Sequence, residues 1–393
     1  QYYLHNFLIE QPDLNFHKPE VQDAVLDVLR FWLERGVDGF RLDTVNYYFH
    51  DPLLRSNPPA RRPRHLPYAV NPYDMQEQKF SKSQPENVGF LKRVRSLLDQ
   101  FPGTTTVGEV GDSHVGLKLM GEYTSGGDKL HMAYTFDMLG NEYSAEHFRT
   151  KLDKFFASTA DGWPCWSFSN HDVDRHISRW AQHARDQKAL AQQAVALLIA
   201  LKGSVCIYQG EELGLPQADI LFEELTDPPG IRFWPEYKGR DGERTPMPWD
   251  EGEAPNGFTT GRPWLPVKPE HAALNAARQN ADPDSTLAGY RRALAFRREH
   301  TALVDGDLEM LKTGEPVLAF RRKTDAEGIL CVYNLSPDPV KVSLVGEGEI
   351  AFGHAAERER DKLLLGPSGY ALLVESVEAP LRLEYKRRTK SRA

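Results

Sequence analysis

Three short apolar runs of the sequence each end on or near a carboxylic acid. They are the run from 37 to 42 followed by Asp43, the run from 104 to 110 that contains Glu109, and the run from 163 to 170 followed by Asp172. Apolar runs of this length, separated by helical patterns, predict buried parallel strands joined by helical crossovers. Because functional groups in such folds lie at the carboxyl ends of the strands, we expect the three acids at one edge of the sheet. A single acid at a strand end caps a helix or binds a structural arginine about as often as it has a function. Three such acids in one series of strands are hard to explain by structural roles alone.

Predicted strands and helices alternate along most of the chain. Helical patterns cover residues 19–35, 87–100, 144–157, 186–202 and 286–300, and strand patterns cover residues 37–43, 104–110, 129–137, 163–170 and 204–208. This alternation predicts an α/β fold, a (β/α)8 barrel, which needs eight strands. Because five are found, we expect the three missing strands to come from a segment that precedes Gln1 or from a second chain.

The pattern changes near residue 304. Short alternating runs separated by turn residues predict a C-terminal antiparallel β-sandwich; the clearest are 317–321, 329–334, 340–345 and 370–375. The predicted domains are therefore a barrel domain over residues 1–303 and an all-β domain over residues 304–393. Within the barrel domain, the proline-rich stretches 51–85 and 217–284 predict long rim loops, and the first of them is expected to shape a binding pocket.

Composition limits the classes of partner. The 393 residues carry a formal net charge of −8, which argues against nucleic acid, and the basic stretches 61–64 and 386–388 are expected to be solvated. No apolar run is long enough to span a membrane. Three cysteines, Cys165, Cys206 and Cys331, lie in apolar runs and are expected to be reduced core residues, which favours a cytoplasmic location.

Four short motifs carry a resemblance to a known family. GFRLDTVN at 39–46, VGEV at 107–110, FSNHD at 168–172 and QPDLN at 11–15 are similar to signatures of the α-amylase family, glycoside hydrolase family 13. YYLHNFL at 2–8, YQGEELGLP at 208–216 and GRDGERTPMPW at 239–249 resemble its α-glucosidase and oligo-1,6-glucosidase branch. The family's Asp…Asn-His motif on the third strand has no counterpart here, and a calcium site typical of relatives would lie in the same N-terminal region.

The resemblance implies roles for the three acids. Asp43 corresponds to the nucleophile, Glu109 to the general acid/base, and Asp172 to the carboxylate that binds sugar hydroxyls and stabilises the transition state. From the residues themselves, Arg41 shares a strand face with Asp43 and should keep it ionised. Glu109 follows Val107 and Gly108 in an apolar strand end, where desolvation and the neighbouring anion should raise its pKa.

Further residues are candidates for substrate binding. Arg41, His171 and Arg240 are assigned to this role by resemblance, with Arg244 as an alternative to Arg240, and Phe136 offers a face for sugar stacking. The tryptophans at 163 and 166 are expected to be core residues. Glu211 and Glu212 correspond to scaffold in the family, and no zinc-ligand spacing is present around His171.

The function that the resemblance implies is a retaining α-glucosidase, a glycoside hydrolase that acts on short α-linked glucosides such as maltose and also transfers glucose to other acceptors. No cofactor is required for this chemistry. Alternatives in the same family are oligo-1,6-glucosidase, a sucrose hydrolase or isomerase, and trehalose synthase. Thr44 favours α-1,4 linkages, because the 1,6-cleaving relatives usually carry valine there. A non-enzymatic amylase-fold subunit is disfavoured, since such proteins lack the catalytic carboxylates.

Overall fold

The computed structural model describes residues 2–60, 71–253 and 255–385. The basic stretches predicted at 61–64 and 386–388, and part of the predicted rim loop 51–85, lie outside these residues. The chain divides into two compact units, residues 1–137 with 154–165, and residues 138–153 with 166–393. The boundary predicted at residue 303 stays a prediction.

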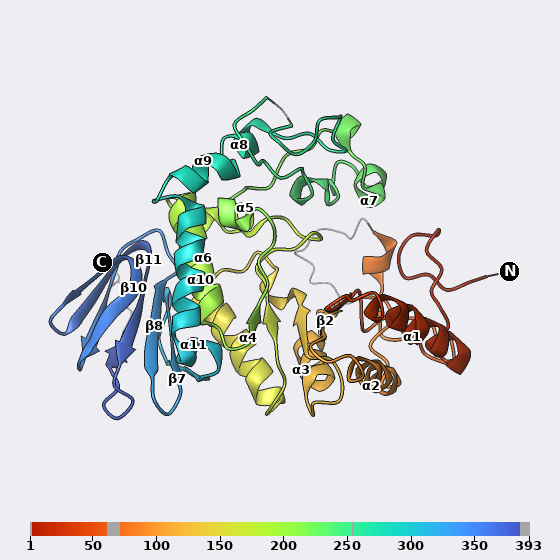
Figure 1. The fold of residues 1–393 in the computed structure, drawn as a ribbon, viewed down its shortest axis with the longest axis horizontal. Helices are drawn as coiled ribbons and strands as arrows, with labels where there is room; N and C mark the ends of the chain where they lie inside the picture. The colour runs from red at the N-terminus through yellow and green to blue at the C-terminus, as the bar shows by residue number, and fades with distance from the viewer. Residues whose placement is uncertain (1, 61–70, 254, 386–393) are drawn as a thin grey trace. The chain divides into compact units, whose positions relative to one another are not determined.

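The first unit contains a parallel sheet with strand order β1-β2-β3. Its elements are α1 (Pro19–Leu33), β1 (Gly39–Leu42), η1 (Pro72–Met75), α2 (Asn87–Leu98), β2 (Thr105–Val110), α3 (Gly116–Thr124), β3 (Met132–Thr135) and η2 (Phe136–Met138). Figure 1 shows α1 and α2 beside each other, near β2. Strand β1 approaches β2 so closely at Gly39 that a Cβ atom there would lie 2.0 Å from the Thr105 carbonyl oxygen. Only glycine therefore fits where the ladder begins.

Two features of this series differ from the sequence prediction. Helix α3 was not predicted: it is only nine residues long and contains two glycines, which favour turns. The predicted strands 163–170 and 204–208 are much shorter, β4 (Cys165–Trp166) and β5 (Ser204–Val205). Strand β4 ends early because side chains take over the backbone bonding: the Ser167 hydroxyl donates to the Ser169 carbonyl, and the Asn170 Oδ1 accepts from the Asp172 N–H.

The second unit contains most of the remaining elements. Helix α4 (Ala145–Ser158) is divided between the two units. The other helices are α5 (His176–Arg179), η3 (Ala181–His183), α6 (Gln187–Ala200), η4 (Glu211–Leu213), η5 (Phe222–Glu224), α7 (Pro228–Arg232), η6 (Asp241–Glu243), α8 (Pro269–Ala272), α9 (Ala276–Ala281), α10 (Thr286–Glu299) and α11 (Thr301–Val304). Apart from short helical turns, the predicted rim segment 217–284 is irregular, and α6 and α10 lie side by side (Figure 1).

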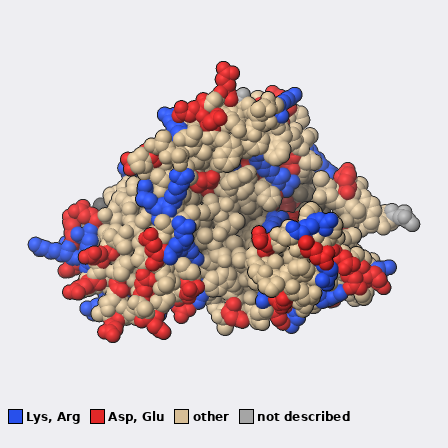
Figure 2. All heavy atoms as spheres, viewed as in Figure 1, with Lys and Arg blue, Asp and Glu red and all other residues tan. Residues whose placement is uncertain are grey.

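An antiparallel sheet fills the C-terminal region, as predicted. Its strands are β6 (Asp307–Met310), β7 (Val317–Lys323), β8 (Gly328–Asn334), β9 (Val340–Val345), β10 (Gly348–Glu359), β11 (Lys362–Glu375) and β12 (Arg382–Glu384). Their order is β12-β9-β11-β8-β7-β6, with β10 paired to β11. Helix α6 is tied to this sheet, because Gln193 donates to the carbonyls of Asn334 and Gly369 and Arg322 donates to the carbonyl of Ala200. Over this sheet Figure 2 shows acidic and basic side chains interspersed.

The cysteine prediction was wrong at one position. Cys165 and Cys331 are buried, but Cys206 is exposed. Its N–H still donates to the Trp166 carbonyl, but β5 ends at Val205 and the chain then leaves the sheet. In the described part of the chain, no helix is both long and apolar enough to cross a membrane.

Candidate active site

One arginine joins two of the three predicted acids. The Arg41 Nη1 donates to Asp43 and its Nη2 donates to Glu109, both through very short contacts. The same Nη2 lies 2.9 Å from the hydroxyl of Tyr134, which itself donates to the Glu109 Oε2. Since these residues all belong to the first unit, the sequence motifs GFRLD and VGEV do come together in space.

The register in which the strands pair explains why Glu109 contacts both Arg41 and Tyr134. Arg41 is paired with Val107, so Glu109, two residues further along β2, projects from the same face of the sheet. On the other side of β2, Glu109 is paired directly with Tyr134 of β3. The hydrogen bond between Glu109 and Tyr134 is thus a cross-strand contact at the carboxyl end of three parallel strands.

The two acids differ in exposure. The Asp43 side chain is 66% exposed, whereas that of Glu109 is 4% exposed. Burial opposes the charged form of Arg41, but its hydrogen bond to Tyr134 and the carboxylates of Glu109 and Asp43 raise its pKa on balance. Burial, followed by the charge of Glu109, raises the pKa of Tyr134, so this phenol remains a proton donor. The Arg41 guanidinium thus contacts Glu109 as well as Asp43, and the two acids differ in their exposure.

The residue after Asp43 has a strained backbone. Thr44 has a φ of +41°, in the left-handed region that β-branched residues avoid. The strain is held by neighbouring bonds, because the Thr44 carbonyl accepts from the Tyr47 N–H and the Val45 N–H donates to the Glu109 carbonyl. The turn that carries Asp43 is therefore fixed to the end of β2.

The third acid lies in the second unit within a cluster of cations. The Asp172 Oδ1 accepts from the Nη1 of Arg240 at 2.8 Å and from the Nη2 of Arg244 at 2.9 Å. Its Oδ2 is 3.2 Å from the Nε2 of His171. The two arginines that the sequence offered as alternatives thus bind the same carboxylate, and Arg244 also donates to the His171 carbonyl.

Arg240 has a second acidic partner that the sequence analysis missed. Asp227, a buried residue, accepts from the Arg240 backbone N–H at 2.9 Å, from its Nε at 3.1 Å and from its Nη2 at 2.8 Å. The hydrogen bond that the Arg240 side chain donates to Asp227 raises the pKa of Arg240, and burial opposes this only in part. Burial raises the pKa of Asp227, but hydrogen bonding and charge from Arg240 outweigh it and leave that pKa low.

The other predicted residues have separate places. Phe136 begins the helical turn η2 after β3 in the first unit and is half-buried. Trp166 is buried as expected, and Trp163 is half-buried. Glu211 is buried with His176, at 3.4 Å between Oε1 and Nδ1, in agreement with a structural role. Within the described ranges no group of three or more potential ligands could hold a metal ion.

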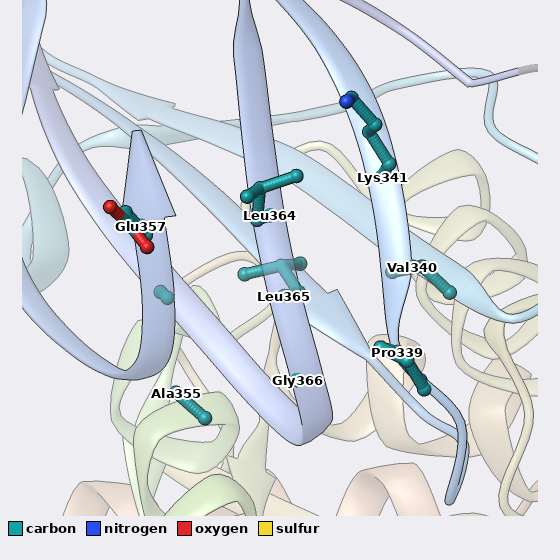
Figure 3. Close-up of a pocket in the computed structure, with 9 residues that line it drawn as sticks. Pro339, Val340, Lys341, Ala355, Glu357, Leu364, Leu365 and Gly366 are labelled. Carbon is teal, nitrogen blue, oxygen red and sulfur yellow. The ribbon is translucent and has the colours of Figure 1, made fainter. Parts of the chain in front are cut away.

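A shallow cavity of about 580 Å³ lies elsewhere, on the C-terminal sheet. Figure 3 shows Leu364 and Leu365 of β11 on its floor, with Pro339 and Lys341 on one side and Glu357 on the other. Among the described residues, Glu357 is the one carboxylate that lines this cavity, whereas glycoside hydrolysis requires two carboxyl groups. The candidate functional residues are therefore those of the two carboxylate clusters, one in each unit.

Comparison with known proteins gives a consistent result. A model of the alpha-amylase catalytic domain matches residues 1–306, which confirms the predicted barrel class. The chain is 52% identical over 342 residues to a probable alpha-glucosidase of Rhizobium meliloti (strain 1021), covering 86% of this chain and 62% of the relative. It is 30% identical over 377 residues to an oligo-1,6-glucosidase of Heyndrickxia coagulans, covering 86% of this chain and 65% of that protein.

A solved structure is similar as well. The crystal structure of the alpha-glucosyl transfer enzyme XgtA superposes with a TM-score of 0.90 at 46% identity, covering 95% of this chain and 71% of that one. The chain spans less than two thirds of the length of the two curated relatives. Because the catalytic-domain model matches more than half of its residues, this chain belongs to the alpha-amylase family.

Proposed function

We propose that the protein is a retaining α-glucosidase that removes terminal α-linked glucose from short oligosaccharides through a covalent glucosyl-Asp43 intermediate. The observation that carries the proposal is the shared guanidinium of Arg41, which holds Asp43 and Glu109 near each other. Retaining glycosidases place their two carboxyl groups about 5–5.5 Å apart, and a shared arginine favours such a short separation. The curated relatives named alpha-glucosidase and oligo-1,6-glucosidase support the same class.

The first step would use the different exposures of the two acids. The exposed Asp43 carboxylate attacks the anomeric carbon, while the buried Glu109 gives its proton to the leaving glycosidic oxygen. Once Asp43 is esterified its charge is gone, and Arg41 then favours the carboxylate form of Glu109. In that form Glu109 removes a proton from the attacking water, which restores Asp43 and regains the proton on Glu109.

The remaining candidates would bind the sugar. Asp172 and His171 accept or donate hydrogen bonds to glucose hydroxyls, Arg240 orients Asp172, and Phe136 offers a partly exposed ring. Acid, base and nucleophile are all side chains, so the proposed reaction needs no cofactor. The relative named as an alpha-glucosyl transfer enzyme supports transfer of glucose to acceptors other than water. We also propose a cytoplasmic location, because the sequence has few cysteines and an odd number of them, which is typical of proteins kept in a reducing compartment.

Linkage preference is proposed to be α-1,4, on the basis of Thr44 after the nucleophile. The competing assignments are oligo-1,6-glucosidase, a sucrose-acting enzyme and trehalose synthase, and a relative of the first kind is 30% identical. Initial rates on maltose, isomaltose, sucrose and trehalose separate these four. Faster hydrolysis of isomaltose than of maltose would overturn the α-1,4 assignment.

The mechanism is tested by two substitutions and two substrates. Asp43→Asn should abolish turnover, whereas Glu109→Gln should slow maltose far more than an aryl glucoside whose leaving group needs no proton. Asp38→Asn is the matched control, since this exposed residue directly precedes β1. Release of the α-anomer first, seen by proton NMR, would support retention, and initial release of the β-anomer would contradict it.

A further inference from the structure

Asp227 lies outside every motif considered above, yet it forms more bonds to Arg240 than the candidate catalytic residue does. Three nitrogen atoms of Arg240 converge on its two oxygen atoms, with distances between 2.8 and 3.1 Å. Its side chain is only 2% exposed, while that of Arg240 is 33% exposed. The buried partner is therefore the fixed one, and the arginine is the group that it immobilises.

Hydrogen bonds and close backbone contacts fix the position of the loop that carries Asp227. Its backbone N–H donates to the Asp241 Oδ2 at 2.9 Å, and the Thr226 hydroxyl donates to the Asp241 Oδ1 at 2.9 Å. Gly230 and Gly239 meet at the neck of this loop, where a Cβ on Gly230 would lie 2.6 Å from the Lys238 carbonyl oxygen. Gly239 also has a φ of +77°, so both positions require glycine.

This anchoring decides where the last nitrogen of Arg240 points. The backbone N–H, Nε and Nη2 of Arg240 are bound to Asp227. The remaining nitrogen of the guanidinium, Nη1, donates to the Asp172 Oδ1 at 2.8 Å. An arginine side chain otherwise has several rotatable bonds, and fixing them costs conformational entropy. Because Asp227 fixes them in advance, the contact with Asp172 is made without a further ordering cost.

We propose that Asp227 is a positioning residue, which clamps Arg240 so that its Nη1 sets the orientation of Asp172. The inference rests on the proposed function, in which Asp172 binds sugar hydroxyls that shift in the transition state. An interaction that is realised mainly in the transition state affects kcat more than KM. Asp227 would therefore influence the reaction without touching the substrate.

Asp227→Asn is the main test, because it keeps the size of the side chain and replaces one acceptor oxygen by a donor NH2 facing the donors of Arg240. Asp219→Asn is the matched control: Asp219 binds Lys238 in the same loop, but both side chains are more than half exposed. We expect Asp227→Asn to lower kcat on an aryl α-glucoside at least tenfold, with less than a threefold change in KM, and Asp219→Asn to leave both unchanged.

A double variant separates positioning from general stability. If Asp227 acts through Arg240, adding Asp227→Asn to Arg240→Ala should cause less than a twofold further loss of kcat. An equal loss in both backgrounds would overturn the proposal. Should Asp227→Asn not fold, Arg240→Lys takes its place, since lysine keeps the charge but cannot bridge both acids; wild-type kcat in that variant would equally refute the clamp.

A crystal structure of Asp227→Asn provides a readout that does not depend on activity. We expect the Arg240 guanidinium to leave the Asp172 Oδ1, and an unchanged contact would overturn the proposal. If the wild-type protein fails to hydrolyse any α-glucoside, the proposed function is wrong, and this structure still decides whether Asp227 positions Arg240.

Discussion

Glu243 should make the folded protein lose stability as the pH rises toward neutrality. Its side chain is 1% exposed, and it lies directly before Arg244 in the turn η6. Burial raises the pKa of Glu243 to about 7. The Gln217 amide, which donates to its Oε2 at 2.6 Å, and Arg244 lower the pKa, while the nearby Asp174 raises it. Desolvation is thus the dominant cause, and the folded state prefers the neutral acid.

The sign and size of the effect follow from this difference. The ordinary pKa of 4.5 applies to the unfolded chain, so the folded chain keeps its proton over a range in which the unfolded chain has lost it. Stability from this group is fully present below about pH 4.5 and is lost as the pH rises to about 7. About 2.5 pKa units at about 1.36 kcal/mol each give a loss of roughly 3 kcal/mol.

Glu243→Gln isolates this contribution. Glutamine mimics the neutral acid and can still accept from Gln217, so the variant should match the wild type near pH 4.5 and exceed its stability by about 3 kcal/mol above pH 7. The measurement is urea unfolding of both proteins at several pH values. Glu223→Gln, which removes an exposed carboxylate from the same rim segment, should show no such trend. A stability difference between Glu243→Gln and wild type that does not change with pH would refute the reasoning.

Two further predictions concern hydrogen bonds to charged groups. Tyr134→Phe removes the hydroxyl that contacts both Arg41 and Glu109, and we expect kcat/KM to fall about 10- to 100-fold, corresponding to about 1.5–3 kcal/mol, with the fold unchanged by circular dichroism; wild-type activity would contradict a role for the phenol. Arg322→Met removes a fully buried arginine that donates to the carbonyls of Ala200 and Gly306, and should lower the free energy of unfolding by about 2–4 kcal/mol in urea titrations, whereas loss of less than about 0.5 kcal/mol would show that these carbonyls find other partners.

The fold could be predicted where periodicity is strong. The helix at 19–35 has proline at its first turn and glycine after its end, and the observed α1 ends within two residues of the prediction. Helix α3 was not predicted because two of its nine residues are glycines, which lower the helix propensity of so short a segment. Strand lengths were overestimated at 163–170, since side-chain hydrogen bonds of Ser167 and Asn170 end the ladder and leave the apolar pattern unchanged.

Candidate residues could be predicted only when a motif contains them. Asp43, Glu109 and Asp172 end or follow apolar runs, which gives a local signal. Tyr134 is important through its pairing with Glu109, and a strand register is not visible in either strand alone. Asp227 lies in a proline-rich loop without periodicity, and only the closure of that loop brings it to Arg240. Residues that act through a partner are therefore the ones that a single sequence conceals.

If Asp172 binds a sugar as proposed, the hydrogen bonds that it already makes limit how many hydroxyls it can accept. An ionised carboxylate offers about four acceptor sites, two on each oxygen. In the described residues, Arg240 and Arg244 occupy both sites of Oδ1, and His171 lies beside Oδ2. One sugar hydroxyl can then donate to Oδ2 without displacing any partner, whereas a second hydroxyl must compete with His171 or an arginine. Because the arginines fix the carboxylate and the histidine neighbours its remaining site, the hydroxyl bound there should also contact His171, so that substitution of either residue weakens the same sugar contact.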